Sequence, residues 1–272
     1  MRPAAERTTA DLIADQAVAH EASVCSRSSD DILLDIQLRR PSGKTIPYRL
    51  RVTVDSDRPL VREDPPDRLP TFCPDRHINV GGYFCLEFSR EDALIVSTAD
   101  GAEKWWARLI KFLSLQETAT VLKRWPTNNE WAHGDAAPHQ AKAERCAAAL
   151  GPRFETALGR RRLHAKRGRN GFIELHVEGR KLFSVHEAAR RVATLRQLCF
   201  CGSGRVLICC GDHTAQAAEL AFALLDWDAD EQAFWNDVRA LACCGRMTSC
   251  PLASSGPEAR TENNPSAETE NT

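Results

Sequence analysis

The segment around Cys85 holds the residues best suited to chemistry. It reads Cys73-Pro-Asp-Arg-His-Ile-Asn-Val-Gly-Gly-Tyr-Phe-Cys-Leu-Glu87, so His77 and Asn79 precede a glycine pair and Cys85 follows in a short apolar stretch. A thiol nucleophile needs exposure, a polar group that stabilises charge on the attacked carbonyl, and a rigid turn that holds both. This segment can supply all three. We therefore predict that Cys85 is a nucleophile assisted by His77 or Asn79.

This segment resembles the active-site segment of ubiquitin-conjugating enzymes. That family has His-Pro-Asn-Ile, a few loop residues, and then Gly, a small residue, an aliphatic residue, Cys and Leu. The residues in register with this pattern are Ile78, Asn79, Gly82, Phe84, Cys85 and Leu86. His77 stands where the family has its oxyanion-stabilising asparagine, and Arg76 where it has proline, so His77 or Asn79 would have to replace that amide. The prokaryotic branches, with a histidine before Gly-x-x-Cys-Leu, are more similar to this chain.

A second segment, in the right order along the chain, adds to the resemblance. It reads Trp125-Pro-Thr-Asn-Asn-Glu-Trp131-Ala-His133-Gly134-Asp-Ala-Ala-Pro-His139 and follows an amphipathic helix predicted over residues 103–120. Bacterial members of the conjugating family have a similar Trp…Trp-x-x-Gly…His segment after the helix that follows the cysteine. His133 and His139 could approach Cys85 in space. Alternatively, each of them caps the following helix or bonds a backbone carbonyl.

The resemblance covers roughly residues 10–150 and implies an acyl-transferring enzyme. An activating enzyme would pass the C-terminal glycine of a ubiquitin-like protein to Cys85 as a thioester, and a lysine of a target protein would then attack it. The setting would be a bacterial ubiquitin-like pathway, for example in anti-phage defence. Two alternatives stay open. One is a thiol hydrolase with His133 or His139 as base, and the other is an inactive adaptor that binds partners.

A second group of cysteines indicates a metal site. The chain reads Cys199-Phe-Cys201-Gly-Ser-Gly-Arg-Val-Leu-Ile-Cys209-Cys210-Gly-Asp-His213, and paired thiolates on tight turns suit tetrahedral zinc. We predict a structural Zn²⁺, because nothing here supplies the open coordination position of a catalytic zinc. Buried free cysteines are the alternative.

This segment resembles the zinc-binding C-terminal motif of the SecA translocation motor, whose first three ligand positions match Cys199, Cys201 and Cys210. The motif places its fourth ligand at residue 211, which is glycine here. Cys209 or His213 would therefore have to complete the site, or else one cysteine of a later group. That later group consists of Cys243, Cys244 and Cys250.

The elements that must position these residues predict an α+β chain with two domains. Residues 1–158 would form a ubiquitin-conjugating-like domain, and residues 159–252 a small, mainly helical domain stapled by zinc. The first is expected to contain a helix over 8–24, strands over 31–38 and 48–54, a proline-rich loop over 57–70, the helix over 103–120, and a helix over 137–158 interrupted at Gly151-Pro152.

In the second domain we expect a basic bend over 160–171 and a hairpin over 172–182. Helices over 215–225 and 228–241 would form a helical hairpin that brings the two cysteine groups together. Residues 253–272 are rich in Ser, Glu, Asn and Thr and are expected to be disordered.

Composition limits the possible functions. The 272 residues are 43% hydrophobic and 27% charged, as in globular proteins, and the net charge of −1 argues against a general nucleic-acid binder. No stretch has the apolar length of a signal peptide or a membrane span. Eleven cysteines without a secretion signal are expected to be thiols and metal ligands rather than disulfides, which predicts a cytoplasmic protein without membrane partners.

Overall fold

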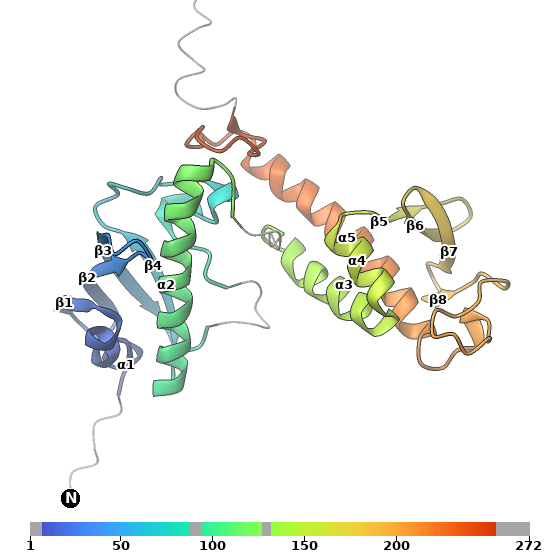
Figure 1. The fold of residues 1–272 in the computed structure, drawn as a ribbon, viewed down its shortest axis with the longest axis horizontal. Coiled ribbons are helices and arrows are strands. Elements are labelled where there is room, and N and C mark those ends of the chain that lie inside the picture. Colours follow the sequence, from blue (N-terminus) through green and yellow to red (C-terminus); the bar gives the residue numbers. More distant parts are fainter. Residues whose placement is uncertain (1–6, 88–93, 127–131, 254–272) are drawn as a thin grey trace, which may run out of the picture. The chain divides into compact units, whose positions relative to one another are not determined.

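The computed structural model describes residues 7–87, 94–126 and 132–253, and it divides into two compact units (Figure 1). Unit 1 combines residues 1–126 with residues 239–272, and unit 2 consists of residues 127–238. Unit 2 is therefore inserted into unit 1 along the chain. Residues 127–158, expected in the first domain, lie in unit 2, where α3 (Ala136–Leu150) packs against α5 (Thr214–Val238), and residues 239–252, expected in the second domain, lie in unit 1.

Unit 1 is built on a four-stranded antiparallel sheet in the order β1-β2-β3-β4. The strands are β1 (Ala22–Arg27), β2 (Asp31–Arg39), β3 (Thr45–Asp55) and β4 (Arg58–Glu63). Side chains alternate along β2 and β3, so that one face of the sheet is buried. The buried side chains on these two strands are Ile32, Leu34, Ile36, Leu38, Ile46, Tyr48, Leu50 and Val52.

Two helices complete the core of unit 1. The long helix α2 (Ala99–Leu122) runs alongside the sheet, and the short helix α1 (Thr9–Gln16) packs against α2 (Figure 1). Trp105 and Trp106 of α2 are fully buried and belong to the core. The indole of Trp106 also donates a hydrogen bond to the carbonyl of Ile13, at 3.0 Å, and so ties α2 to α1.

Two sequence-based boundaries in unit 1 were wrong. The helix predicted over 8–24 ends at Gln16, because a 3₁₀ turn follows and Glu21 takes a left-handed conformation; Val24 lies in β1. The loop predicted over 57–70 begins with strand β4, whose Pro59 is tolerated because β4 is an edge strand. Between β4 and α2 the described residues include two further 3₁₀ turns, Pro74–Arg76 and Val80–Gly82.

Unit 2 packs three helices with a second antiparallel sheet in the order β5-β6-β7-β8 (Figure 1). The elements besides α3 and α5 are α4 (Pro152–Gly159), β5 (Leu163–Arg167), β6 (Phe172–Val177), β7 (Arg180–His186), β8 (Arg191–Val192) and a 3₁₀ turn, Leu207–Cys209. The break at Gly151-Pro152 and the hairpin are confirmed. The basic run instead contains β5, and its inward side chains Leu163 and Ala165 are buried.

The predicted helical hairpin over 215–241 was wrong, because α5 is one continuous helix of 25 residues. Its midpoint, Asp226-Trp227, contains neither glycine nor proline and so provides no break. At 1.5 Å per residue, α5 is about 37 Å long. It therefore separates His213 from Cys243 along the chain instead of bringing them together. Among the described residues, no helix is long and apolar enough to cross a membrane.

Candidate active site and metal centres

A tight turn precedes Cys85. Gly81 and Gly82 have φ angles of 82° and 81°, a region that glycine reaches without the strain a Cβ atom would cause. Asn79 N donates to Tyr83 O at 2.7 Å, and Gly82 N donates to Thr71 O at 2.7 Å. The glycine pair therefore forms the predicted turn, and backbone hydrogen bonds hold this turn in place.

The backbone of Cys85 is held by two neighbouring segments. Phe84 N donates to Val61 O of β4 at 2.9 Å, and Cys85 N donates to His77 O at 2.8 Å. Ile78 and Phe84 also pair as an isolated antiparallel bridge. The strand-like path of Cys85 follows from these bonds, which connect it directly to the loop that carries His77.

The thiol of Cys85 is half-buried and donates to Glu87 O at 3.3 Å. Burial, together with the nearby carboxylate of Glu87, raises the pKa of Cys85 to about 11. That carboxylate lies 2.6 Å from the guanidinium of Arg58, on β4. Cys85 is therefore a protonated thiol at neutral pH, and a base or an incoming electrophile must assist its ionisation.

The two candidate oxyanion-stabilising residues differ in their surroundings. His77 has a left-handed backbone, with φ of 53°, and its ring meets that of Trp125 edge-on with centroids 4.7 Å apart. Asn79 is exposed and makes no capping hydrogen bond to the 3₁₀ turn that it precedes. His77 is thus oriented by an aromatic neighbour, whereas the amide of Asn79 is presented at the surface.

A buried arginine, which no local pattern in the sequence indicates, supports this loop. Arg76, which is 2% exposed, donates to the side chain of Gln116 at 2.8 Å, to its carbonyl at 3.1 Å, and to the hydroxyl of Thr120 at 2.9 Å. Gln116 in turn donates to Arg76 O. Arg76, placed where the conjugating family has proline, therefore fastens the His77 loop to α2.

The two later histidines lie in unit 2, where α5 provides their partners. His133 Nδ1 lies 2.7 Å from Glu231, and the His133 ring stacks on Phe234. His139 Nε2 lies 3.1 Å from Asp230. These contacts are ones that structural histidines make, and a role beside Cys85 remains a prediction.

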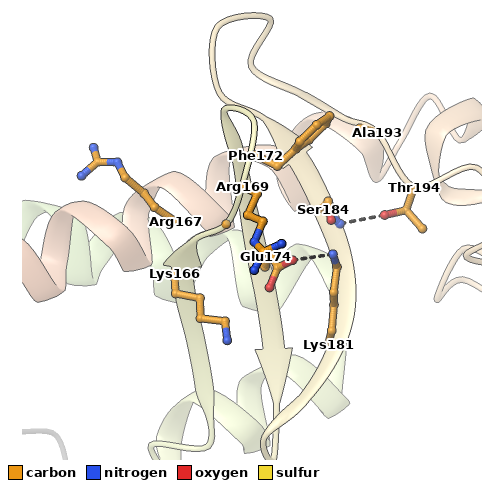
Figure 2. A pocket seen from close by; sticks show the side chains of 10 residues that line it. Lys166, Arg167, Arg169, Phe172, Glu174, Lys181, Ser184, Ala193 and Thr194 are labelled. Carbon is orange, nitrogen blue, oxygen red and sulfur yellow. Dashed lines mark hydrogen bonds and ion pairs between the residues drawn. The ribbon is translucent and has the colours of Figure 1, made fainter.

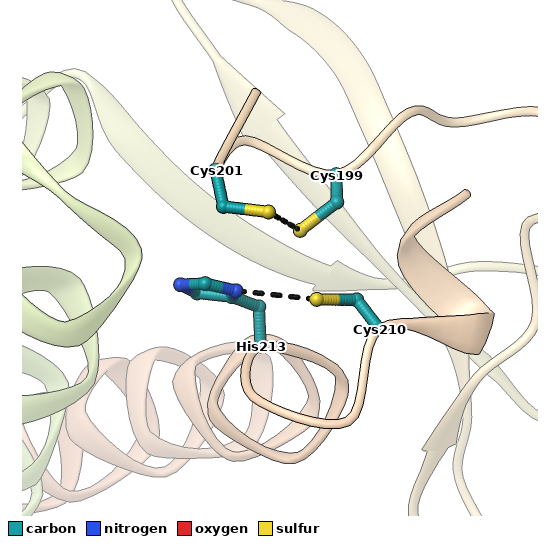
Figure 3. Close-up of side chains that lie close together, drawn as sticks. All are labelled: Cys199, Cys201, Cys210 and His213. Atoms are coloured by element: carbon teal, nitrogen blue, oxygen red, sulfur yellow. Dashed lines mark hydrogen bonds between the residues drawn. The ribbon is translucent and has the colours of Figure 1, made fainter. Parts of the chain in front are cut away.

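The first cysteine group converges at the start of α5 (Figure 3). The ligand atoms of Cys199, Cys201, Cys210 and His213 all lie within 4.8 Å of one another. The sulfurs of Cys199 and Cys201 are 3.3 Å apart, and Cys210 Sγ lies 3.3 Å from His213 Nδ1. Cys209 is exposed and lies outside this group. Three thiolates and one imidazole fit a closed tetrahedral zinc site.

The three cysteines beyond α5 form a separate group with Cys73. Cys243, Cys244 and Cys250 were expected to be candidates for the fourth ligand of the first site. In the structure Cys243 and Cys244 lie with Cys73 in unit 1, and Cys250 contacts Cys243. The helical hairpin that was expected to bring these residues to His213 is a single continuous helix, α5.

Unit 2 also contains an open pocket of about 710 Å³ on one face of its sheet (Figure 2). Four cationic side chains line it, but Lys181 is paired with Glu174 at 2.6 Å. The cations at the pocket are Lys166, Arg167, Arg169 and Lys181. It contains none of the predicted nucleophiles or metal ligands.

Comparison with known families agrees with this arrangement. Residues 20–127 match the model of the prokaryotic E2 domain. Residues 132–252 match the model of a cysteine-rich domain, C-terminal to E2 domain. No curated protein and no solved structure gave a significant match to the chain. The chain thus combines an α+β E2 domain with a cysteine-rich domain, whereas the likeness to the SecA motif remains a prediction.

Proposed function

We propose that this protein is a ubiquitin-like protein conjugating enzyme that carries its cargo as a thioester on Cys85. The observation that supports this most directly is the position of Cys85 inside the segment matched to the prokaryotic E2 domain, held by Val61 and His77 through the backbone bonds around it. Its partners are a ubiquitin-like protein, an activating enzyme and a protein with an acceptor lysine, in a bacterial pathway of the kind used in anti-phage defence.

The chemistry consists of two acyl transfers. First, the Cys85 thiol loses its proton as its sulfur attacks the carbonyl carbon of a thioester on the activating enzyme; a new C–S bond forms, the old one breaks, and the activating enzyme's sulfur leaves and takes up a proton. Then the lysine amine attacks the Cys85 thioester, an amide forms, the C–S bond to Cys85 breaks, and the proton lost by the amine restores the Cys85 thiol. Sulfur suits this carrier role because a thioester acylates an amine without further energy input.

The surroundings of Cys85 favour conjugation over thiol hydrolysis. Cysteine hydrolases depend on a lowered thiol pKa, whereas burial and Glu87 raise the pKa of Cys85. Transthiolation tolerates a protonated resting thiol, because the preceding thioester is already activated. Negative charge on the tetrahedral intermediate would be stabilised by His77 or Asn79.

The first cysteine group has a structural role in this proposal. Cys199, Cys201, Cys210 and His213 would hold one Zn²⁺ through four protein ligands, which leaves no position for a substrate. Cys199 and Cys210 also belong to the core of unit 2, together with Leu207 and Leu220. The ion would therefore stabilise the small unit rather than take part in acyl transfer.

Thioester formation tests the proposal. With ATP, an activating enzyme and a ubiquitin-like protein ending in glycine, both taken from the same gene neighbourhood, a non-reducing gel should show a one-to-one adduct that thiol reductant removes. Cys85→Ser should give a reductant-resistant ester or no adduct, and Cys25→Ser, an exposed cysteine on β1, serves as the matched control. An adduct that persists unchanged in Cys85→Ala would refute the proposal.

A further inference from the structure

Cysteines from distant parts of the chain meet inside unit 1. The ligand atoms of Cys73, Cys243 and Cys244 lie within 4.8 Å of one another, and Cys250 contacts Cys243. Cys73 precedes the His77 loop, and the other three lie beyond residue 238. The sulfur of Cys73 is 3.7 Å from that of Cys243 and 3.3 Å from that of Cys244, and the sulfurs of Cys243 and Cys250 are 3.7 Å apart. Cys73, Cys243 and Cys250 are at most 5% exposed.

The distances suit a shared metal ion and exclude a bond between the sulfurs. A disulfide needs about 2.05 Å between its sulfurs. Two thiolates on one tetrahedral zinc, each about 2.3 Å from the ion, lie about 3.8 Å apart. The spacings of 3.3–3.7 Å are close to the second value, as are those of the Cys199 group.

Direct contacts hold the C-terminal segment, residues 239–253, against the same part of unit 1. Thr248 N donates to Lys123 O at 2.8 Å, just beyond the end of α2, and Ser249 Oγ donates to Asp75 at 2.6 Å. Met247 and Leu252 are buried, at 2% and 4% exposure. The bonds of Thr248 and Ser249 thus fix the stretch between Cys244 and Cys250 beside the segment that carries Cys73.

We propose that Cys73, Cys243, Cys244 and Cys250 form a second, four-thiolate metal centre that binds Zn²⁺. Each thiol gives up its proton as it becomes a ligand, and no change in oxidation state is involved. All four positions of the tetrahedron are occupied by protein, so the centre is structural. Its ligands come from both matched families, since Cys73 lies in the E2 domain and the other three in the cysteine-rich domain.

The centre lies at one end of the loop that holds Cys85. Cys73 and Ile78 close this loop by exchanging backbone hydrogen bonds of 2.9 and 3.0 Å, and His77 O accepts from Cys85 N. Loss of the ion should therefore release the C-terminal segment and loosen the support of Cys85. This second centre does not depend on the proposed conjugating activity.

Metal content of the full-length protein tests this inference. By elemental analysis the wild type should hold two zinc ions per chain. Cys73→Ser and Cys250→Ser should each hold one, Cys210→Ser one, and Cys73→Ser/Cys210→Ser none. Cys25→Ser and Cys209→Ser, both at exposed cysteines outside the two groups, should keep two.

A second measurement covers the case in which Cys73→Ser does not fold. Cobalt(II) titrated into metal-free wild-type protein should saturate at two ions per chain, with the thiolate-to-cobalt absorption expected of seven thiolates. Saturation at one ion with three thiolates would overturn the proposal. It would also be overturned by a folded Cys73→Ser that keeps the wild-type metal content, or by mass spectrometry that finds Cys73 in a disulfide.

Discussion

The guanidinium of Arg76 is enclosed by the side chain and the carbonyl of a single residue, Gln116. These two residues are 2% and 0% exposed, and Gln116 also donates to the carbonyl of Arg76. The charge of Arg76 is thus satisfied by neutral acceptors, with Thr120 as a third. The loop that precedes the nucleophile is therefore attached to the longest helix of unit 1 by a buried polar network.

Gln116→Leu should destabilise unit 1 strongly, because it leaves a buried cation and a buried carbonyl without their partner. A hydrogen bond to a charged group contributes about 1.5–3 kcal/mol, so we expect a loss of about 2–3 kcal/mol in the free energy of unfolding, measured by denaturant titration. The double variant Arg76→Met/Gln116→Leu should lose less than Gln116→Leu alone, because the unpaired charge is gone. Gln37→Leu, at an exposed site on β2, is the control. If the double variant is less stable than Gln116→Leu alone, the Arg76 guanidinium does not need Gln116 as its hydrogen-bond partner.

The reactivity of Cys85 should rise with pH across the alkaline range. Because its pKa is raised to about 11, its alkylation by iodoacetamide should increase about tenfold per pH unit between pH 7 and 10. Glu87→Gln removes a negative charge that disfavours the thiolate, so it should lower the pKa and speed alkylation at pH 8. Glu103→Gln, which removes an exposed carboxylate on α2, should leave the rate of Cys85 alkylation unchanged. Site-resolved mass spectrometry measures both, and a plateau of alkylation below pH 8 in the wild type would contradict the expectation.

The raised pKa of Cys85 also makes the stability of the folded protein depend on pH. The folded protein keeps the Cys85 proton up to about pH 11, whereas the unfolded thiol loses it near its ordinary value of 9.0. Between these values the folded state binds more protons, so the free energy of unfolding should fall as pH rises. This part of the pH dependence should disappear in Cys85→Ala.

His77 and Asn79 can be separated by single-turnover discharge. If His77 stabilises the oxyanion, His77→Ala should load Cys85 nearly normally but transfer to lysine about 10²–10³ times more slowly. Val80→Ala, at a 61% exposed side chain in the same loop, is the control. A silent His77→Ala together with a slow Asn79→Ala would assign the role to Asn79. Equal losses of loading and discharge in His77→Ala would indicate a folding defect instead.

The first metal centre should control the order of unit 2. His213→Ala or Cys199→Ser should remove one zinc ion and increase hydrogen exchange over residues 195–225, because these ligands join two turns to the start of α5. Cys209→Ser should change neither quantity. A variant without this ion that keeps wild-type protection in unit 2 would show that the helices and sheet hold the unit together without metal.

Much of the E2 domain was predictable because its signals are local. The alternation along β2 and β3, the apolar stripe of α2 and the glycine pair before Cys85 each specify a structure within a few residues. The convergence of Cys199, Cys201 and Cys210 was also apparent from spacing.

What could not be predicted depends on long-range contacts. Nothing near Cys73 indicates partners 170 and 171 residues away, and nothing near Arg76 indicates Gln116 on α2. A separate helix was predicted from residue 228 because Asp228 and Glu231 have the spacing of a capping box, and this spacing fits the interior of the continuous helix α5 equally well. Because the predicted helical hairpin would bring the Cys199 group and the Cys243 group together, the two groups were expected to share one metal site.

Unit 1 is formed by two separate parts of the sequence, and this affects how its cysteines should evolve. The chain leaves unit 1 after Pro126 and returns at Arg239, while the cysteine-rich family match continues to residue 252. In the proposed second metal centre, Cys73 of the first family segment and Cys243, Cys244 and Cys250 of the second thus depend on one another for metal binding. During evolution they should be gained and lost as a set, and an exchange of whole cysteine-rich domains between relatives should be tolerated only where the recipient already carries the equivalent of Cys73.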